Sequence, residues 1–346
     1  MTQQNQPIEP IRLNANENPM GPSPLAIQSI THVLSQVNTY PGADLAPQLR
    51  EAIAAAWDNR ITADQIVLGS GSVGVMHIIA QLYLDTPEAE CLVMPPVFPF
   101  FLNYCQTHNH KLVKVPLQSE RFRADLTAVL AAITPNTRIV YLCNPNNPTG
   151  SYITARELAD FMAQVPDHAL VVHDQAYHHF VDAPDFPDSL LPVLDGKHFL
   201  VLHSFSKVFG LAGMRLGYGI ARPDIIARLE AIAPPSQLNK LNLTAGLNAL
   251  NDSDHIQRSI ANNAAGKAWL TEQLEALDCR VWPTQASFMI FQATMPAATI
   301  IERLEVAGVL VRPAFFSPEH VRVSIGNPAQ NQQFITALSR ILAEGA

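Results

Sequence analysis

Short apolar runs alternate with longer helical patterns over the first two thirds of the chain, and this alternation constrains the fold more than any other feature. Several runs are apolar on both faces, as parallel strands covered by helices on both sides are. The alternation therefore predicts a doubly wound, mostly parallel α/β domain. Helices are expected at Val73–Leu84, Leu126–Ile133 and Thr154–Val165, and strands at Gln65–Leu68, Cys91–Met94, Leu112–Val115, Ile139–Cys143, Leu170–His173, Phe199–His203 and Leu216–Ile220.

The rhythm changes after the Pro234-Pro235 pair, which marks a break between two parts of the chain. A long helical pattern from Asp254 to Leu277 is followed by strand candidates at Phe288–Phe291, Leu310–Arg312 and Val321–Ile325. This second part is expected to form a smaller α/β domain. We therefore predict an N-terminal arm over 1–30, a large domain over 31–235 and a small C-terminal domain over 236–346.

Composition narrows the class of protein. The 346 residues carry a net charge of −8 without a basic cluster, which disfavours a nucleic-acid surface. No apolar run has the length of a membrane span, and no secretory signal is expected from the polar first residues. The four cysteines, at 91, 105, 143 and 279, lack metal-ligand or redox spacing, and the histidine pairs lack ligand partners. We expect a cytoplasmic protein without a metal site.

A glycine-rich turn, Gly69–Gly74, follows the first strand and opens a helix. It fits the dinucleotide pattern G-x-G-x-x-G, but the next strand, Cys91–Met94, is followed by prolines rather than by an acidic residue that could hold a ribose. The backbone N–H groups of Ser72 and Val73 at a helix N-terminus still suit a phosphate. A tight turn without a ligand is the alternative.

Polar motifs also follow two later strands. The rigid Asn144–Gly150 turn places an amide, Asn147, at the carboxyl end of Ile139–Cys143, where α/β ligands bind. Asp174 and Tyr177 follow the strand Leu170–His173 at the same edge. Each motif alone also fits a structural turn or a helix cap.

The last motif is Ser204-Phe205-Ser206-Lys207, which is followed by Arg215. A lone lysine after a strand is usually a surface residue, but cationic and polar neighbours lower the pKa of an amine and make it nucleophilic. Taken together, the motifs place a phosphate turn, an amide, a carboxylate, a phenol, a lysine and an arginine at one sheet edge. Pyridoxal phosphate requires these groups.

At this point the chain resembles the fold-type I, aspartate-aminotransferase-like enzymes that use pyridoxal phosphate, and in particular the histidinol-phosphate aminotransferase family. The similarity runs from Leu13–Pro19 through Tyr40-Pro41-Gly42 to Arg322–Gly326. The Asn-Pro-Thr-Gly turn, the Asp-x-Ala-Tyr motif and the Ser-x-Ser-Lys motif with the following arginine occur in the family's order.

The resemblance implies roles for individual residues. Lys207 would form the Schiff base and move the proton between the substrate Cα and cofactor C4′, while Asp174 would keep the ring nitrogen protonated. Asn147 and Tyr177 would hydrogen-bond the cofactor 3′-oxygen, and Arg322 would bind the acidic group of the substrate. Phe98 would stack on the ring, and Asn16 and Met20 would face the substrate. The phosphate would be held by Ser72, Val73, Ser204, Ser206 and Arg215, and by Tyr40 of a partner subunit in a homodimer with shared sites.

Three residues depart from the family's usual pattern, namely Gln175, Met20 and Phe98, where many members have Glu, Tyr or Leu, and Tyr. The resemblance implies transamination between an amino donor and a 2-oxo acid, with histidinol phosphate and 2-oxoglutarate as the expected pair. An aromatic or other amino-acid aminotransferase, a pyridoxal-phosphate decarboxylase or elimination enzyme, and a nucleotide-binding protein without this cofactor stay open as alternatives.

Overall fold

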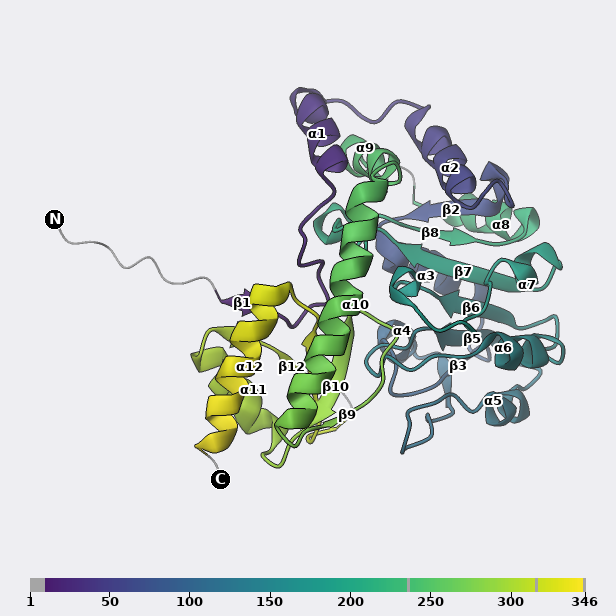
Figure 1. The fold of residues 1–346 in the computed structure, drawn as a ribbon. Coiled ribbons are helices and arrows are strands. Elements are labelled where there is room, and N and C mark those ends of the chain that lie inside the picture. Colours follow the sequence, from purple (N-terminus) through teal and green to yellow (C-terminus); the bar gives the residue numbers. More distant parts are fainter. Residues whose placement is uncertain (1–9, 235–236, 315–316, 345–346) are drawn as a thin grey trace.

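A seven-stranded mixed sheet forms the centre of the large part of the molecule (Figure 1). The computed structural model describes residues 10–234, 237–314 and 317–344. The sheet is mostly parallel; only β8 runs antiparallel to both of its neighbours. All seven strand predictions are confirmed. The strand order is β2 (Ile66–Gly69), β8 (Gly217–Ile220), β7 (Phe199–Ser204), β6 (Leu170–Asp174), β5 (Thr137–Cys143), β3 (Glu90–Val93) and β4 (Lys111–Lys114).

Helices cover both faces of this sheet because its strands are apolar on both faces. Along β5, Val140 and Leu142 point into one apolar layer, and Tyr141 and Cys143 point into the other. The doubly wound prediction is confirmed. One layer is covered by α3 (Gly71–Tyr83), α4 (Phe100–His108) and α8 (Pro223–Ile232), and the other by α2 (Leu45–Ala56), α5 (Leu126–Ala132), α6 (Ala155–Met162) and α7 (Leu191–Leu194).

The C-terminal part has a sheet and a core of its own. Its strands are antiparallel and follow the order β12 (Arg312–Pro313), β13 (Val321–Ser324), β10 (Phe288–Gln292) and β9 (Arg280–Val281). Three helices pack on them: α10 (Ser253–Ala276), α11 (Ala297–Val306) and α12 (Pro328–Ala343). The long helix predicted from Asp254 to Leu277 is α10, which runs from beneath α9 down to the small sheet in Figure 1.

The N-terminal arm joins the two parts. Its first strand, β1 (Ile11–Arg12), pairs with β11 (Val309–Leu310), and α1 (Pro24–Val33) packs against α9 (Lys240–Ala249). Residues 1–9 of the predicted arm lie outside the described residues. α9 also packs on α2. The predicted domain bounds, 30 and 235, stay a prediction. Short 3-10 helices complete the fold at Leu34–Gln36, Ala63–Gln65, His178–Phe180 and Ala212–Met214.

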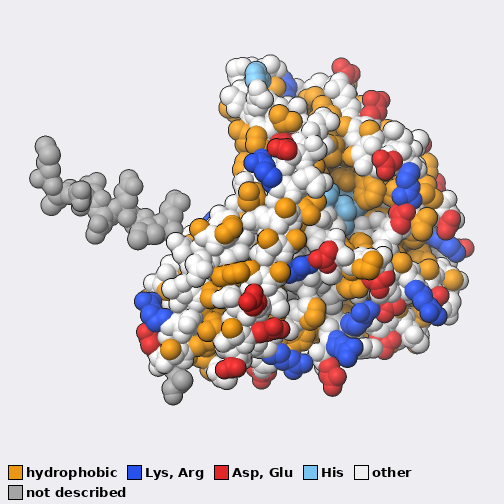
Figure 2. Space-filling model, in the orientation of Figure 1, with side chains coloured by type: hydrophobic (Ala, Val, Ile, Leu, Met, Phe, Trp, Pro, Cys, Tyr) orange, Lys and Arg blue, Asp and Glu red, His pale blue; other side chains and the backbone are white. Residues whose placement is uncertain are grey.

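The surface and the cysteines add two observations. Within the described ranges, no helix is both long and apolar enough to cross a membrane. Acidic and basic side chains are interspersed on the face that Figure 2 shows. All four cysteines are buried and free. The cytoplasmic location stays a prediction.

Candidate active site

The carboxyl ends of β5, β6 and β7 meet the N-terminus of α3 around a cavity of about 370 Å³. Parallel strands end at one edge of a sheet, and polar side chains from separate motifs converge there. Of the predicted site residues, all except Tyr40 and Met20 line this cavity. Those that line it are Asn16, Ser72, Val73, Phe98, Asn147, Asp174, Tyr177, Ser204, Ser206, Lys207, Arg215 and Arg322.

One end of the cavity is suited to an anion. The first amides of α3, including those of Ser72 and Val73, have no partner within the helix. A Cβ atom on Gly71 would lie 2.7 Å from Nη2 of Arg215. The absence of a side chain at Gly71 therefore allows the Arg215 guanidinium to pack against the N-terminus of α3. Gly217 likewise allows close approach, because its Cβ would lie 2.3 Å from the Ser72 nitrogen. With the Ser204 and Ser206 hydroxyls, these groups can hold a phosphate.

A buried carboxylate, Asp174, ends β6 and lines the cavity. Its Oδ2 accepts a hydrogen bond from the Tyr141 hydroxyl at 2.8 Å, and its Oδ1 accepts one from the Ala176 nitrogen at 3.1 Å. Burial raises the pKa of Asp174, while these two hydrogen bonds and the charge of Lys207 oppose the rise. The carboxylate can thus pair with a protonated nitrogen of a ligand in the cavity.

Lys207 follows β7 and is partly buried beside the N-terminal arm. Its Nζ donates a hydrogen bond to the carbonyl oxygen of Asn16 at 3.0 Å and lies 5.4 Å from the centroid of the Tyr177 ring. Burial, with a smaller contribution from the Arg322 charge, lowers the pKa of Lys207 to about 8. A substantial fraction of this amine is therefore neutral near physiological pH, which is the state that attacks a carbonyl.

A hydrogen-bond network surrounds the Tyr177 hydroxyl. Asn16 donates to it at 3.1 Å and Asn147 at 3.5 Å. Arg322 donates from Nη1 to Oδ1 of Asn147 at 2.8 Å and from Nη2 to the Asn14 carbonyl at 2.9 Å. Burial raises the pKa of Tyr177 well above its ordinary value, so the phenol keeps its proton. The network orients an amide and a phenol toward one point, as two donors to a ligand oxygen require.

Three predicted or singled-out residues lie elsewhere. Met20 is 39% exposed and does not line the cavity. Tyr40 is 85% exposed and lines a separate hollow formed with residues 37–41 and 238–241. The Gln175 side chain is buried, and its Oε1 accepts a hydrogen bond from the Ser189 hydroxyl at 2.7 Å. The roles predicted for Met20 and Tyr40 stay predictions.

Two polar residues near this site belong to no motif that stands out in the sequence. Tyr141 was hidden in an apolar run, where a tyrosine resembles any other core aromatic residue. Tyr141 lies beneath the cavity, whereas Arg312 lines it, from the edge strand of the small sheet. Its only signal was a basic residue within a short strand candidate, ten positions before Arg322.

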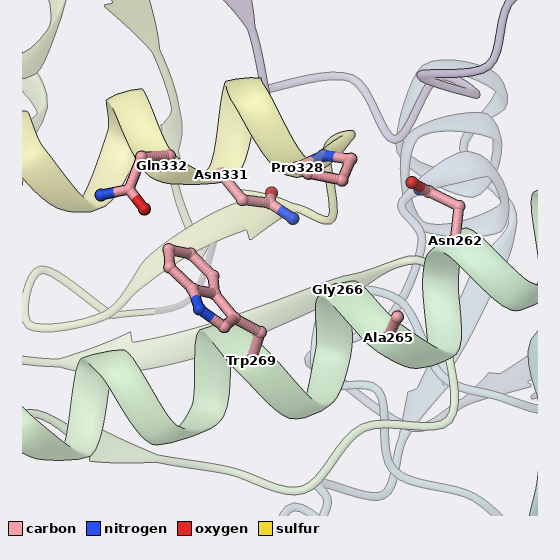
Figure 3. A pocket seen from close by; sticks show the side chains of 7 residues that line it. All are labelled: Asn262, Ala265, Gly266, Trp269, Pro328, Asn331 and Gln332. Carbon is pink, nitrogen blue, oxygen red and sulfur yellow. The ribbon is translucent and has the colours of Figure 1, made fainter.

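Another hollow, of about 390 Å³, lies between α10 and α12 (Figure 3). The Trp269 ring and the Gln332 amide point into the space between the two helices. All of the residues that line it are neutral, so it offers no acid, base or nucleophile. Among the described residues, no group of three His, Cys, Asp or Glu side chains is arranged to hold a metal ion.

The groups around the 370 Å³ cavity fit pyridoxal phosphate. They supply an amine of lowered pKa, a buried carboxylate, two donors for a phenolic oxygen, an aromatic ring at Phe98 and an anion site. The mixed sheet and the position of the lysine after β7 define the fold-type I class of pyridoxal-phosphate enzymes.

Comparison with known proteins names the family. The model for aminotransferase class I and II matches residues 8–338. The chain is 38% identical to a histidinol-phosphate aminotransferase of Symbiobacterium thermophilum over 97% of this chain and 91% of the relative. It is 37% identical to histidinol-phosphate aminotransferase 1 of Nitrosococcus oceani over 96% of this chain and 89% of the relative. The solved histidinol-phosphate aminotransferase of Sinorhizobium meliloti, in complex with pyridoxal-5'-phosphate, has a TM-score of 0.87 and 25% identity, covering 98% of this chain and 92% of that one.

The chain therefore belongs to the aminotransferase class I and II family and is a pyridoxal-phosphate-dependent transaminase. The predicted family, fold class, enzyme type and cofactor are confirmed. The alternative of a nucleotide-binding protein without this cofactor is excluded. The coarse partner prediction, an amino compound and a 2-oxo acid, follows from the family.

The lowered pKa of Lys207 gives a pH dependence that can be measured. Only the neutral amine attacks, so the rate at which the cofactor-free protein takes up pyridoxal phosphate should rise with pH and level off above a midpoint near 8. Replacing Arg322 with Met removes a positive charge that disfavours the ammonium form. The Lys207 pKa, and with it the midpoint, should move to higher pH. Stopped-flow absorbance over a pH series measures this midpoint.

The control is Arg156→Met, which removes an arginine that is 91% exposed on α6. Its midpoint should equal that of the wild type. A midpoint near the ordinary lysine value in the wild type, or a downward shift in Arg322→Met, would contradict the assignment.

Proposed function

We propose that this transaminase uses histidinol phosphate as the amino donor and 2-oxoglutarate as the acceptor. The observation that carries the proposal is a pair of arginines, Arg312 and Arg322, in the cavity that holds Lys207. Arg322 is almost fully buried, so an anionic group of a substrate would meet it away from water. Two guanidinium groups suit a phosphate dianion in the donor and a carboxylate in the acceptor. The names of the relatives support the same donor.

Each residue around Lys207 has a distinct role in the proposed reaction. When bound, pyridoxal phosphate supplies a ring that spreads the electrons released at the substrate carbon. Lys207 would take the proton from the substrate Cα and would be the group that carries it toward the cofactor. Asp174 would keep the ring nitrogen of the cofactor protonated, and Tyr177 and Asn147 would donate hydrogen bonds to its 3′-oxygen. Arg322 fixes the acidic group of each substrate in turn.

Two other uses of the same scaffold remain as competing hypotheses. Arg322 could hold the carboxylate of an aromatic or other amino acid, because a guanidinium binds carboxylate and phosphate alike. A decarboxylase or elimination enzyme would use the same lysine and carboxylate. Arg312 favours a donor with a phosphate over an aromatic amino acid, since one carboxylate needs only one arginine; it does not distinguish transamination from decarboxylation or elimination.

A screen of single half-reactions tests the donor. The holoenzyme, mixed with one amino donor and no oxo acid, should convert its cofactor once to pyridoxamine phosphate and stop. At limiting concentrations, histidinol phosphate should react about ten- to a hundredfold faster than histidinol, because charge-assisted hydrogen bonds to the phosphate are lost in histidinol. Stopped-flow absorbance follows the conversion.

Two variants test whether Arg312 recognises the phosphate of the donor. Arg312→Met should reduce the ratio of histidinol phosphate to histidinol rates, and Arg303→Met, on the exposed side of α11, should leave the ratio unchanged. A faster reaction with phenylalanine or tyrosine would favour the amino-acid aminotransferase. Continuous release of carbon dioxide or ammonia would favour the decarboxylase or elimination enzyme.

We also propose a homodimer with shared sites. Six exposed large apolar side chains lie between residues 20 and 40, namely Met20, Leu25, Ile27, Leu34, Val37 and Tyr40. Hydrophobic side chains are visible over the region of α1 in Figure 2. A cluster of this kind suits a surface that a second copy covers, and Tyr40 would then reach the phosphate site of the partner.

A mixing experiment tests the shared site. Tyr40→Ala should bind pyridoxal phosphate weakly, and Lys207→Ala should have no activity. Hybrid dimers of the two variants contain one site with both native residues, so refolding the two together should restore up to half of the wild-type activity per hybrid. Activity that never exceeds the sum of the separate variants would contradict shared sites, and a monomer by light scattering would contradict the dimer.

A further inference from the structure

Tyr141 lies in the middle of β5, one strand away from Asp174, and its side chain is completely buried. The register pairs Tyr141 with Val172 and Cys143 with Asp174. Tyr141 and Asp174 are therefore diagonal neighbours on one face of the sheet, a separation that a long side chain can span. Tyr141 reaches the carboxylate from beneath the cavity and does not line it.

The hydroxyl of Tyr141 fixes one oxygen of the carboxylate. It donates to Oδ2 of Asp174 at 2.8 Å, while the Ala176 nitrogen donates to Oδ1 at 3.1 Å. With a donor on each oxygen, the carboxylate cannot rotate without breaking a hydrogen bond. A carboxylate oxygen accepts more than one hydrogen bond, so each still has capacity for a ligand.

The ring of Tyr141 is held independently of its hydroxyl. Its centroid lies 5.1 Å from that of Phe101, in the apolar layer under α4. Removing only the hydroxyl would leave this packing in place. The oxygen is therefore the part of Tyr141 that acts on Asp174.

The hydrogen bond from Tyr141 affects the protonation state of Asp174. Burial raises the pKa of Asp174, and the Tyr141 hydrogen bond is the largest influence in the opposite direction, ahead of Ala176 and Lys207. Tyr141 itself stays protonated because burial raises its pKa well above the ordinary value, and burial raises that of the adjacent Cys143 too. Tyr177, the other titratable neighbour, also keeps its proton. Among the described residues, Lys207 is the cation whose charge lowers the pKa of Asp174.

We propose that Tyr141 is a positioning residue for the cofactor: its hydroxyl keeps Asp174 ionised and oriented toward the ring nitrogen of pyridoxal phosphate. This role depends on the cofactor and not on the identity of the amino donor. Failure of the histidinol-phosphate proposal would leave it untouched.

The test is the affinity of the full-length, cofactor-free protein for pyridoxal phosphate, measured by fluorescence titration over a pH series. Tyr141→Phe should bind about ten- to a hundredfold more weakly, the scale of a lost hydrogen bond to a charged group. Without the Tyr141 hydroxyl the pKa of Asp174 is higher. As the pH is lowered, the affinity of Tyr141→Phe for pyridoxal phosphate should therefore start to fall at a higher pH than that of the wild type. The matched control is Tyr83→Phe, which removes a buried hydroxyl bonded to His198 at 2.9 Å, and it should bind as the wild type does.

A second ligand separates positioning from a general loss of structure. The 1-deaza analogue of pyridoxal phosphate has carbon in place of the ring nitrogen, so Asp174 has nothing to hold in it. Tyr141→Phe and the wild type should bind this analogue equally. In an Asp174→Asn background, Tyr141→Phe should cause no additional loss of affinity.

Three results would overturn the proposal: unchanged affinity for pyridoxal phosphate in Tyr141→Phe, equal weakening for both ligands, or full additivity with Asp174→Asn. Should Tyr141→Phe not fold, 3-fluorotyrosine at position 141 provides a second variant. Its phenol is a stronger donor, so the acid limb of cofactor affinity should move to lower pH. An unmoved limb would overturn the proposal as well.

Discussion

Asp174, which is buried, and Lys207, which is partly buried, are an acid and a base at the carboxyl edge of the central sheet. Burial disfavours the charged form of each group. The protonation state that each group needs for the reaction therefore depends on its neighbours. For Asp174 the neighbours are hydrogen-bond donors, which favour the carboxylate. For Lys207 the pKa is lowered to about 8, so a substantial fraction of the amine is neutral near physiological pH. The protonation states of Asp174 and Lys207 are thus set by their surroundings in the fold and not by residue type alone.

The N-terminal arm completes this arrangement by connecting both parts of the molecule. Asn16, in a left-handed backbone conformation, accepts the Lys207 hydrogen bond through its carbonyl. Its side chain donates to Tyr177 and accepts from Ser324 of the small sheet at 3.1 Å. One residue therefore links the lysine, the phenol and the small domain.

Much of this could be predicted from the sequence, because its signals are local. Strands buried on both faces are apolar throughout, and the motifs after β5, β6 and β7 carry turn residues and polar groups that stand out. Tyr141 could not be found in this way, since its function depends on a diagonal pairing between two strands. The Gln175 departure could not be interpreted either, because only the fold shows that its side chain contacts Ser189 away from the cavity. The packing of α9 on α1 depends on contacts between residues more than 200 positions apart, which no local pattern reveals.

The claim on which the rest depends is that Lys207 carries the cofactor. Borohydride reduction of the holoenzyme makes the lysine–cofactor link permanent, and mass spectrometry of a tryptic digest then locates it. We expect a phosphopyridoxyl group on the peptide spanning residues 198–215, uncleaved at Lys207, and no label in Lys207→Ala. A label on another lysine, such as Lys197 or Lys240, or an unlabelled protein after incubation with pyridoxal phosphate, would contradict the account.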